Sequence, residues 1–154
     1  MQLVQDSAIA LYILSLTEAK IVFTVNENIA KLVELISSHS LPVSVIVTMD
    51  SILEKHQQLC DSQNIDLTTI PASIKKGKDT PSPVSPQTPE STATITFTSG
   101  TSAQPKGVPL AQANIVTALS YVASILPSEI MLHKGRARFY AMLPFGHIME
   151  RADV

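Results

Sequence analysis

The stretch KIVFTVNENIAKLVELISSHSLPVSVIVTM, residues 20–49, decides the fold. Its start, Lys20–Val25, is rich in β-branched and aromatic residues and predicts a strand. A helix should follow, because apolar residues recur there at helical spacing: Ile29, Leu32, Val33 and Ile36. Asn26 and Asn28 offer N-cap chemistry for it. Val43–Met49 then predicts a second buried strand. Strand, helix and strand in this order form a βαβ unit, which indicates a parallel sheet and an α/β fold.

On either side of this unit the chain changes character. Ser7–Leu16 is apolar without Gly or Pro and predicts a buried or half-buried helix, and Ser51–Asn64 predicts a further short helix. Residues 71–92 contain five prolines and three lysines, so we expect a solvated loop. The Ser-x-x-Lys spacing of Ser73 and Lys76 is expected by chance in such a segment. We therefore divide the chain into residues 1–70, 71–92 and 93–154.

Ordered structure is expected again after residue 92. Ala93, Ile95 and Phe97 alternate with Thr94, Thr96 and Thr98, which predicts a half-buried strand with threonines on one face. A polar loop follows, then the short strand GVPLAQ. The helix Gln112–Leu126 should end at Pro127, and Arg138–Phe145 predicts a last strand.

The polar loop, residues 98–107, has the ingredients of a phosphate site: hydroxyls, glycines and a lysine. Backbone N–H groups near glycine can approach an anion closely, and hydroxyls and an ammonium group add donors. The common pattern G-x-x-x-x-G-K-[ST] does not fit, because Pro105 stands at the second glycine and Gly107 replaces the hydroxyl residue that binds Mg²⁺. These two departures argue against a P-loop of the kinase or GTPase kind.

The loop resembles that of another family. TFTSGTSAQPKGV, residues 96–108, is similar to the phosphate loop of the AMP-forming adenylating enzymes, the acyl-CoA synthetases and ligases, apart from Ala103 where that family usually has glycine. Met142–Arg151, MLPFGHIMER, resembles the next motif of the long-chain fatty-acyl members. The resemblance implies an α/β fold: part of the N-terminal domain of an adenylate-forming enzyme, a layered, mostly parallel sheet with flanking helices.

The same resemblance implies a function and a set of site residues. A long-chain fatty acid–CoA ligase activates a carboxylate with ATP to an acyl-adenylate and then forms a thioester with coenzyme A. The residues implied to hold the ATP phosphates are Thr98, Ser99, Gly100, Thr101, Ser102, Lys106 and Gly107. Thr98 would also contact Mg²⁺, and His147 would line the acyl or adenylate pocket. Fatty acid, ATP and coenzyme A are the implied partners.

Other features set limits on the function. The net charge of −2 and an aromatic content of 5% argue against a nucleic-acid partner. Cys60 is the single cysteine and is interpreted as a reduced structural thiol. His39, His56 and His133 lie in polar segments, and we expect each at the surface. The pair His147 and Glu150 lacks a third metal ligand.

The expected location is the cytoplasm or the cytosolic face of a membrane such as that of the ER or peroxisome. The longest apolar run near the start, Ala8–Leu14, is far short of the roughly 20 residues of a spanning helix. No signal peptide is expected, because no basic region precedes that run. Peripheral membrane contact is compatible with a fatty-acid substrate.

Family members are several times longer, so the domain is expected to be incomplete at both ends, with no complete catalytic set in the 154 residues. Two hypotheses follow. Either the chain is a fragment whose function belongs to a complete ligase, or it is a catalytically dead truncated chain that acts as a weak phosphate-binding or protein-interaction module. A structural module with a coincidental loop is a third. In the first two cases we expect no carboxylate-dependent ATP–pyrophosphate exchange from the chain alone.

Overall fold

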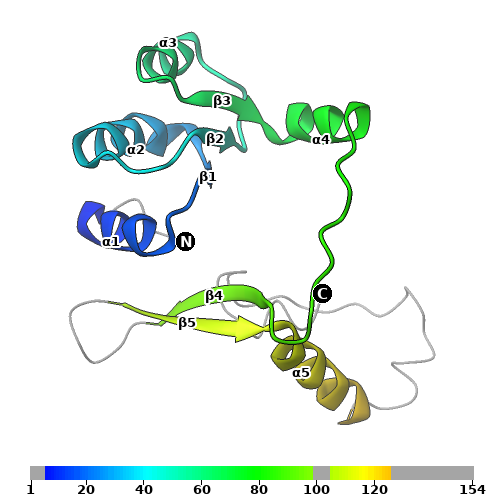
Figure 1. The fold of residues 1–154 in the computed structure, drawn as a ribbon. Helices are drawn as coiled ribbons and strands as arrows, with labels where there is room; N and C mark the ends of the chain where they lie inside the picture. The colour runs from blue at the N-terminus through cyan, green and yellow to red at the C-terminus, as the bar shows by residue number, and fades with distance from the viewer. Residues whose placement is uncertain (1–5, 99–104, 126–154) are drawn as a thin grey trace. The chain divides into compact units, whose positions relative to one another are not determined.

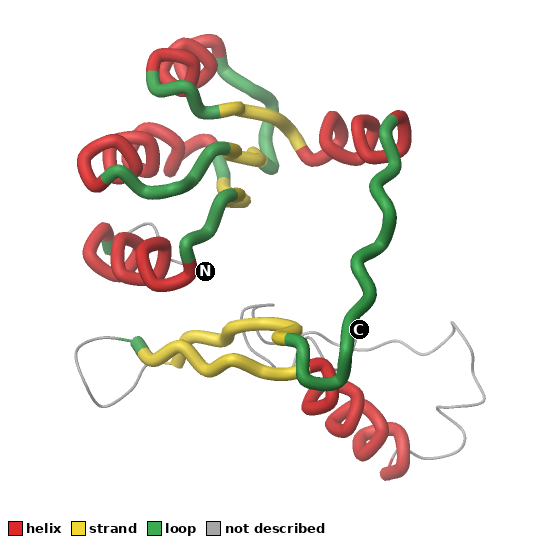
Figure 2. The backbone as a smooth tube through the Cα atoms, in the orientation of Figure 1, coloured by secondary structure: helices red, strands yellow, loops and turns green. Residues whose placement is uncertain are grey.

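The computed structural model describes residues 6–98 and 105–125 (Figure 1). These residues fall into two compact units, one within residues 2–84 and one within residues 85–154, and each is described separately. Figure 2 shows that the first contains most of the helices and a small sheet, whereas the second contains a two-stranded ribbon followed by a helix.

The first unit alternates helices and strands along the chain. Its elements are α1 (Ser7–Thr17), β1 (Ile21–Thr24), α2 (Asn26–His39), β2 (Val45–Thr48), α3 (Glu54–Ser62), β3 (Asp66–Thr69) and α4 (Ile70–Asp79). The three strands form a parallel sheet in the order β1-β2-β3, in which Ile21 pairs with Val45 and Val45 with Asp66. The predicted βαβ unit and α/β fold are confirmed.

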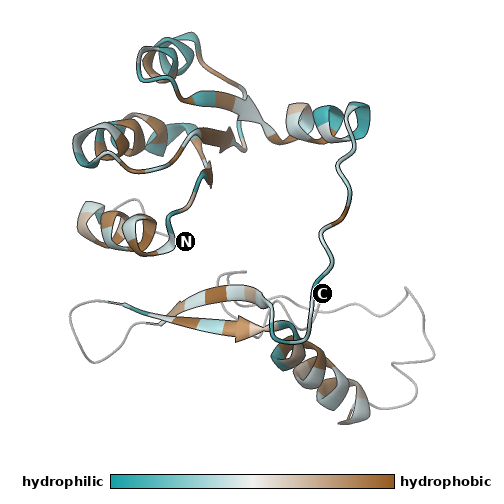
Figure 3. Cartoon of the chain, viewed as in Figure 1, coloured by the Kyte–Doolittle hydropathy of each residue, from teal (hydrophilic) through white to brown (hydrophobic). Residues whose placement is uncertain are grey.

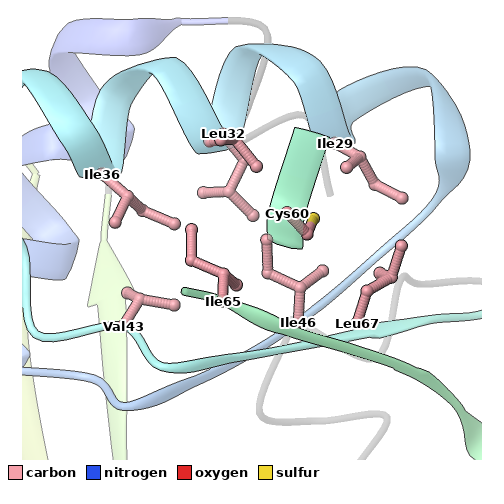
Figure 4. Packing of buried hydrophobic residues seen from close by; sticks show 9 residues of the cluster. Ile29, Leu32, Ile36, Val43, Ile46, Cys60, Ile65 and Leu67 are labelled. Carbon is pink, nitrogen blue, oxygen red and sulfur yellow. The ribbon is translucent and has the colours of Figure 1, made fainter. Parts of the chain in front are cut away.

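The core of this unit lies between the sheet and its helices. The buried cluster joins side chains of α2, α3, β2 and β3 and of the loops before the strands (Figure 4): Ile29, Leu32, Val33, Ile36, Val43, Ile46, Cys60, Ile65 and Leu67. All four apolar residues predicted to line one face of α2 are among them. β2 is apolar up to its last residue, Thr48, whereas α3 is largely hydrophilic and contributes few residues to the core (Figure 3).

One face of the edge strand β1 is exposed, whereas the neighbouring strand β2 is buried on both faces, since Ile46 is fully buried and Val47, the partner of Phe23, is only 3% exposed. Along β1, Thr24 is buried and Val22 half-buried, while the alternating residues Ile21 and Phe23 are 55% and 60% exposed. Successive side chains of a strand point to opposite faces, so α2 and α3 cover one face of β1 and the other is exposed.

Two elements of this unit were not predicted. β3 was not recognised, and Ile70–Asp79 is the helix α4 although residues 71–92 were expected to be loop. Thr69 explains where α4 begins, because its hydroxyl accepts from the N–H of Ala72 at 3.3 Å and Pro71 is tolerated in a first turn. The helix ends at Thr80, since a residue followed by proline disfavours the helical conformation.

The second unit is a hairpin and a helix. β4 (Thr92–Thr98) pairs antiparallel with β5 (Lys106–Ala111), and α5 (Gln112–Ile125) follows. The first N–H groups of α5 are satisfied by carbonyls of a preceding turn: Gln112 donates to Ser91 and Ala113 to Pro89, both at 2.9 Å. The strand around Phe97, the strand GVPLAQ and the helix starting at Gln112 are therefore confirmed. The strand predicted at Arg138–Phe145 lies outside the described residues.

Candidate phosphate-binding hairpin

Thr98 and Lys106 form the last strand pair of the hairpin before the loop that joins β4 and β5. They are cross-strand partners, the last residue of β4 and the first of β5, and both are exposed. Side chains of directly opposed residues project from the same face of a sheet and lie close together. The hydroxyl of Thr98 and the ammonium group of Lys106 thus share one face at the base of the loop that joins the strands. This pair offers an anion a donor hydroxyl and a full positive charge.

The rest of the predicted phosphate loop is not described. Ser99, Gly100, Thr101, Ser102 and Ala103 lie outside the described residues, as does His147 with the second motif. Of the seven residues predicted to hold phosphate, the structure therefore places Thr98, Lys106 and Gly107. It brings these three together at one end of the ribbon.

Gly107 has a packing reason to be glycine. It pairs with Phe97, and a Cβ atom at position 107 would lie 3.1 Å from Cε1 and 3.3 Å from Cζ of that ring. A contact this short would force the ring to move, so the aromatic side chain packs directly against the glycine backbone. This pair lies on the opposite face of the ribbon from Thr98 and Lys106, because faces alternate along a strand. Contact between Gly107 and phosphate stays a prediction.

The threonine face of the hairpin follows the predicted register. Thr94, Thr96 and Thr98 pair with Leu110, Val108 and Lys106, while Ile95 and Phe97 pair with Pro109 and Gly107. The expected contrast in burial is absent, since Ile95 on the apolar face is 44% exposed whereas Thr94 and Thr96 are half-buried. The alternation along β4 therefore specifies the register of the hairpin without defining a buried face in this unit.

The other place where an anion could be expected is occupied by the protein itself. In parallel α/β sheets, ligands commonly bind beyond the carboxyl ends of the strands, near helix N-termini. Here the carboxylate of Asp50, just after β2, accepts a 2.7 Å hydrogen bond from the N–H of Asn26 at the start of α2. The helix terminus is thus capped by an internal anion. The predicted capping by Asn26 or Asn28 is wrong, because Val25 is the N-cap residue and the cap comes from the distant Asp50.

Three further hydrogen bonds fix the same corner. The side-chain amide of Asn26 donates to the carbonyl of Ser51 at 2.8 Å. The buried Thr48 hydroxyl donates to Oδ1 of Asn26 and accepts from the N–H of Asp50, both at 3.2 Å. The only signal in the sequence was the polar residues that follow both strands. The polar groups at the start of α2 are thus already hydrogen-bonded within the protein. The hairpin is therefore the better candidate for a phosphate site in the part of the chain that the structure describes.

Cys60 and the histidines form no second site among the residues that the structure describes. Burial, and secondarily the charge of Asp61, raises the pKa of the Cys60 thiol, which disfavours the nucleophilic thiolate and fits a structural role. His39 is exposed as predicted, and His133 lies outside the described residues. The prediction for His56 is wrong: it is 6% exposed, because its position on α3, one turn before Cys60, faces the core.

Metal and membrane features are absent from residues 6–98 and 105–125. Within those ranges no three His, Cys, Asp or Glu residues converge as metal ligands would, and none of the helices is long and apolar enough to cross a bilayer. At the hairpin, a cation that prefers oxygen ligands could use the hydroxyl of Thr98, and the described residues provide no cluster of carboxylates there as further ligands.

Comparison with known families identifies the chain. The family described as "AMP-binding enzyme" matches residues 6–154. The chain belongs to the AMP-binding enzyme family. The resemblance seen in the loop and in the second motif is therefore confirmed.

Relatives within the AMP-binding family are mostly fatty acyl-CoA synthetases. "Long chain acyl-CoA synthetase 6, peroxisomal" of Arabidopsis thaliana is 27% identical over 146 residues, which cover 92% of this chain and 19% of that protein. "Fatty acyl-CoA synthetase B" of Dictyostelium discoideum is 27% identical over 93% of this chain and 21% of its own length. A "Sulfoacetate--CoA ligase" of Cupriavidus necator is 31% identical over 89% of this chain and 23% of that protein. The chain thus spans about a fifth of the length of the relatives it matches.

A solved structure supports the fold assignment within this family. The adenylation domain of a carboxylate reductase from Mycobacterium chelonae superimposes with a TM-score of 0.70, covering 99% of this chain and 24% of that chain. The sequence identity is 16%, so this likeness concerns the fold alone. The predicted fold class, part of an adenylate-forming domain, is confirmed.

Proposed function

We propose that this chain supplies the phosphate-holding hairpin of an AMP-forming long-chain fatty acid–CoA ligase. The cross-strand pair of Thr98 and Lys106 at the base of the loop carries the proposal, since it gives the family's phosphate motif a described geometry. Among the three relatives described above, the names include long-chain acyl and sulfoacetate substrates, and CoA appears in all three names. The fatty-acid substrate rests on the more numerous acyl-CoA synthetases and on the form of the second motif.

The proposed reaction has two steps. A carboxylate oxygen attacks the α-phosphorus of ATP, and the bond to the bridging oxygen of pyrophosphate breaks. The thiol of coenzyme A then attacks the acyl carbonyl, loses its proton, and displaces AMP to give the thioester. The first step concentrates negative charge on the departing pyrophosphate, so fixed donors beside it lower the barrier.

The hairpin residues fit the charge problem of the first step. The ammonium group of Lys106 would neutralise part of the charge on the β- and γ-phosphates, and the hydroxyl of Thr98 would donate to a phosphate oxygen. Pairing on two hydrogen-bonded strands fixes the backbone positions of both residues before the nucleotide arrives, so only the side chains must be ordered on binding. Ser99, Gly100, Thr101, Ser102 and Gly107 would complete the loop, and His147 the acyl or adenylate pocket.

Mg²⁺ fits the site in a limited way. It prefers oxygen ligands and is usually held by nucleotide phosphates, water and one or two protein groups. The exposed hydroxyl of Thr98 could supply one such oxygen. When bound, the ion would neutralise phosphate charge. Two relatives, both from Arabidopsis thaliana, are named peroxisomal, which agrees with the peroxisome as one of the proposed locations.

The test titrates the ¹⁵N-labelled chain with ATP and measures binding from the changes in chemical shift of the backbone amide signals of β4 and β5. Lys106→Ala should weaken binding by roughly 10- to 100-fold, the loss expected for one hydrogen bond to a charged group. Lys75→Ala is the matched control, because it removes the same charge from an exposed position on α4 and should leave binding unchanged.

The outcomes separate the hypotheses. Shifts in β4 and β5 that Lys106→Ala abolishes support the ligase-derived phosphate site. Equal losses of ATP affinity in both lysine variants would mean that the chain attracts ATP only through its general charge. If ATP shifts no amide signal of the wild-type chain, a protein-interaction module would be favoured. Carboxylate-dependent ATP–pyrophosphate exchange above that of Lys106→Ala would contradict the expectation that the chain alone is inactive.

A further inference from the structure

A proline-rich segment separates α4 from β4. Residues 80–91 contain neither helix nor strand, and residues 80–90 are all exposed, with Val84 at 92%. The boundary between the two compact units, after Val84, falls inside this segment. A protein that must bind the backbone in extended form can therefore reach it without unfolding either unit.

The segment repeats one dipeptide. A hydroxyl residue precedes proline four times within ten residues: Thr80–Pro81, Ser82–Pro83, Ser85–Pro86 and Thr88–Pro89. Proline has no N–H group and disfavours the helical conformation in the residue before it, so each hydroxyl sits on a backbone biased to extended structure. Some enzymes bind the residue after the modified hydroxyl residue in a pocket that has no hydrogen-bond acceptor. Proline fits such a pocket because it has no N–H group, whereas any other residue would bury an unpaired N–H donor.

The structure distinguishes the four hydroxyls. Thr80 donates to the carbonyl of Lys76 at 2.8 Å and helps to end α4. The hydroxyl of Thr88 lies 3.2 Å from that of Ser91, in the turn that satisfies the first N–H groups of α5. The hydroxyls of Ser82 and Ser85 make no hydrogen bond to any described residue.

We propose that Ser82 and Ser85 are phosphorylation sites for a proline-directed serine/threonine protein kinase. In each transfer the serine Oγ attacks the γ-phosphorus of the kinase's ATP, and a new O–P bond forms. The bond to the β,γ-bridging oxygen breaks, ADP leaves, and the hydroxyl proton passes to the kinase's base. Thr80 and Thr88 are poorer substrates, because each must first give up a hydrogen bond.

The modification would change the charge of the segment strongly. Each phosphate carries about −1.5 to −2 charges at pH 7, against a net charge of −2 for the whole chain. Lys75, Lys76 and Lys78 on α4 are exposed, and none forms an ion pair with another residue among those described. They are the nearest cations in sequence, and phosphate oxygens are acceptors that suit them.

The experiment uses the complete 154-residue chain, a recombinant mitogen-activated protein kinase as probe, and intact-mass and peptide mass spectrometry. We expect one phosphoryl group each on Ser82 and Ser85. The Ser82→Ala/Ser85→Ala variant should lose nearly all incorporation, whereas Thr80→Ala/Thr88→Ala should keep it. The melting curve of the serine variant should match that of the wild type, because both side chains are exposed and unbonded.

A second pair of variants tests the role of proline. Pro83→Ala and Pro86→Ala retain both serines but restore the N–H after each one, and each should lose phosphorylation at its own serine. Incorporation that persists in these variants, or that falls mainly on Thr80 or Thr88, would overturn the proposal. So would an unmodified wild-type chain that instead binds a recombinant WW or SH3 domain, which would make the segment a polyproline ligand.

Discussion

The threonine at the end of β2 offers a sharp test of how the first unit is held together. Thr48 is fully buried, and its hydroxyl donates to Oδ1 of Asn26 and accepts from the N–H of Asp50. Thr48→Val keeps the shape and removes both hydrogen bonds. Each bond contributes about 0.5–1.5 kcal/mol, which gives about 1–3 kcal/mol in all.

The geometry places the expected loss in the lower half of that range. Both bonds are 3.2 Å long, near the upper limit for a good hydrogen bond. Asp50 is exposed and Asn26 half-buried, so water can replace part of what the hydroxyl supplied. We therefore expect Thr48→Val to lower the free energy of unfolding of this unit by about 1–1.5 kcal/mol.

Thr24→Val is the matched control. Thr24 lies at the corresponding position of β1 and is 6% exposed, and its side chain has no hydrogen-bond partner among the described residues. Its replacement should be neutral or slightly stabilising, because valine favours strands and buries a methyl group in place of the hydroxyl. Hydrogen exchange of the β2 amides reports the opening free energy of this unit separately. Equal effects of the two substitutions would refute the argument that the hydrogen bonds, and not valine packing, stabilise the corner.

Two further predictions concern glycine and histidine. Gly107→Val should destabilise the hairpin by about 1–3 kcal/mol, because the new side chain overlaps the ring of Phe97. In a double-mutant cycle followed by hydrogen exchange in β4 and β5, Phe97→Leu should relieve part of that cost, and strict additivity would argue against the overlap. His56→Leu should be neutral or stabilise the first unit by up to about 2 kcal/mol, because Nδ1 is buried and has no hydrogen-bond partner among the described residues. A chemical denaturation midpoint well below that of the wild type would mean that this nitrogen is in fact satisfied.

The sequence predicted the fold where local patterns and tertiary packing agree. Lys20–Met49 carries both the strand and the helix periodicity, and the structure follows them. β3 was missed because Asp66–Thr69 is polar at three of its four positions, and only Leu67 of the strand joins the core. α4 was missed because its proline, glycine and lysines resemble loop composition, while its cap at Thr69 stabilises the first turn.

The candidate site was predictable as a motif and not as a geometry. The pattern around Gly100 identified Thr98 and Lys106, but their direct opposition depends on the register of two strands. The contact of Gly107 with Phe97 depends on the same register. The caps at Asn26 and the burial of His56 require knowledge of which segments meet in space, which no local spacing supplies.

The order of strands in the first sheet has a consequence for biosynthesis. Each strand pairs with the one made immediately before it, and paired residues are 24 and 21 positions apart along the chain. Contacts at such short separations incur little loop-closure entropy and favour rapid folding. As the chain leaves the ribosome, β2 can pair with β1, and β3 with β2, without waiting for a distant partner. We therefore expect this unit to fold during translation, before the whole phosphate hairpin has emerged from the ribosome.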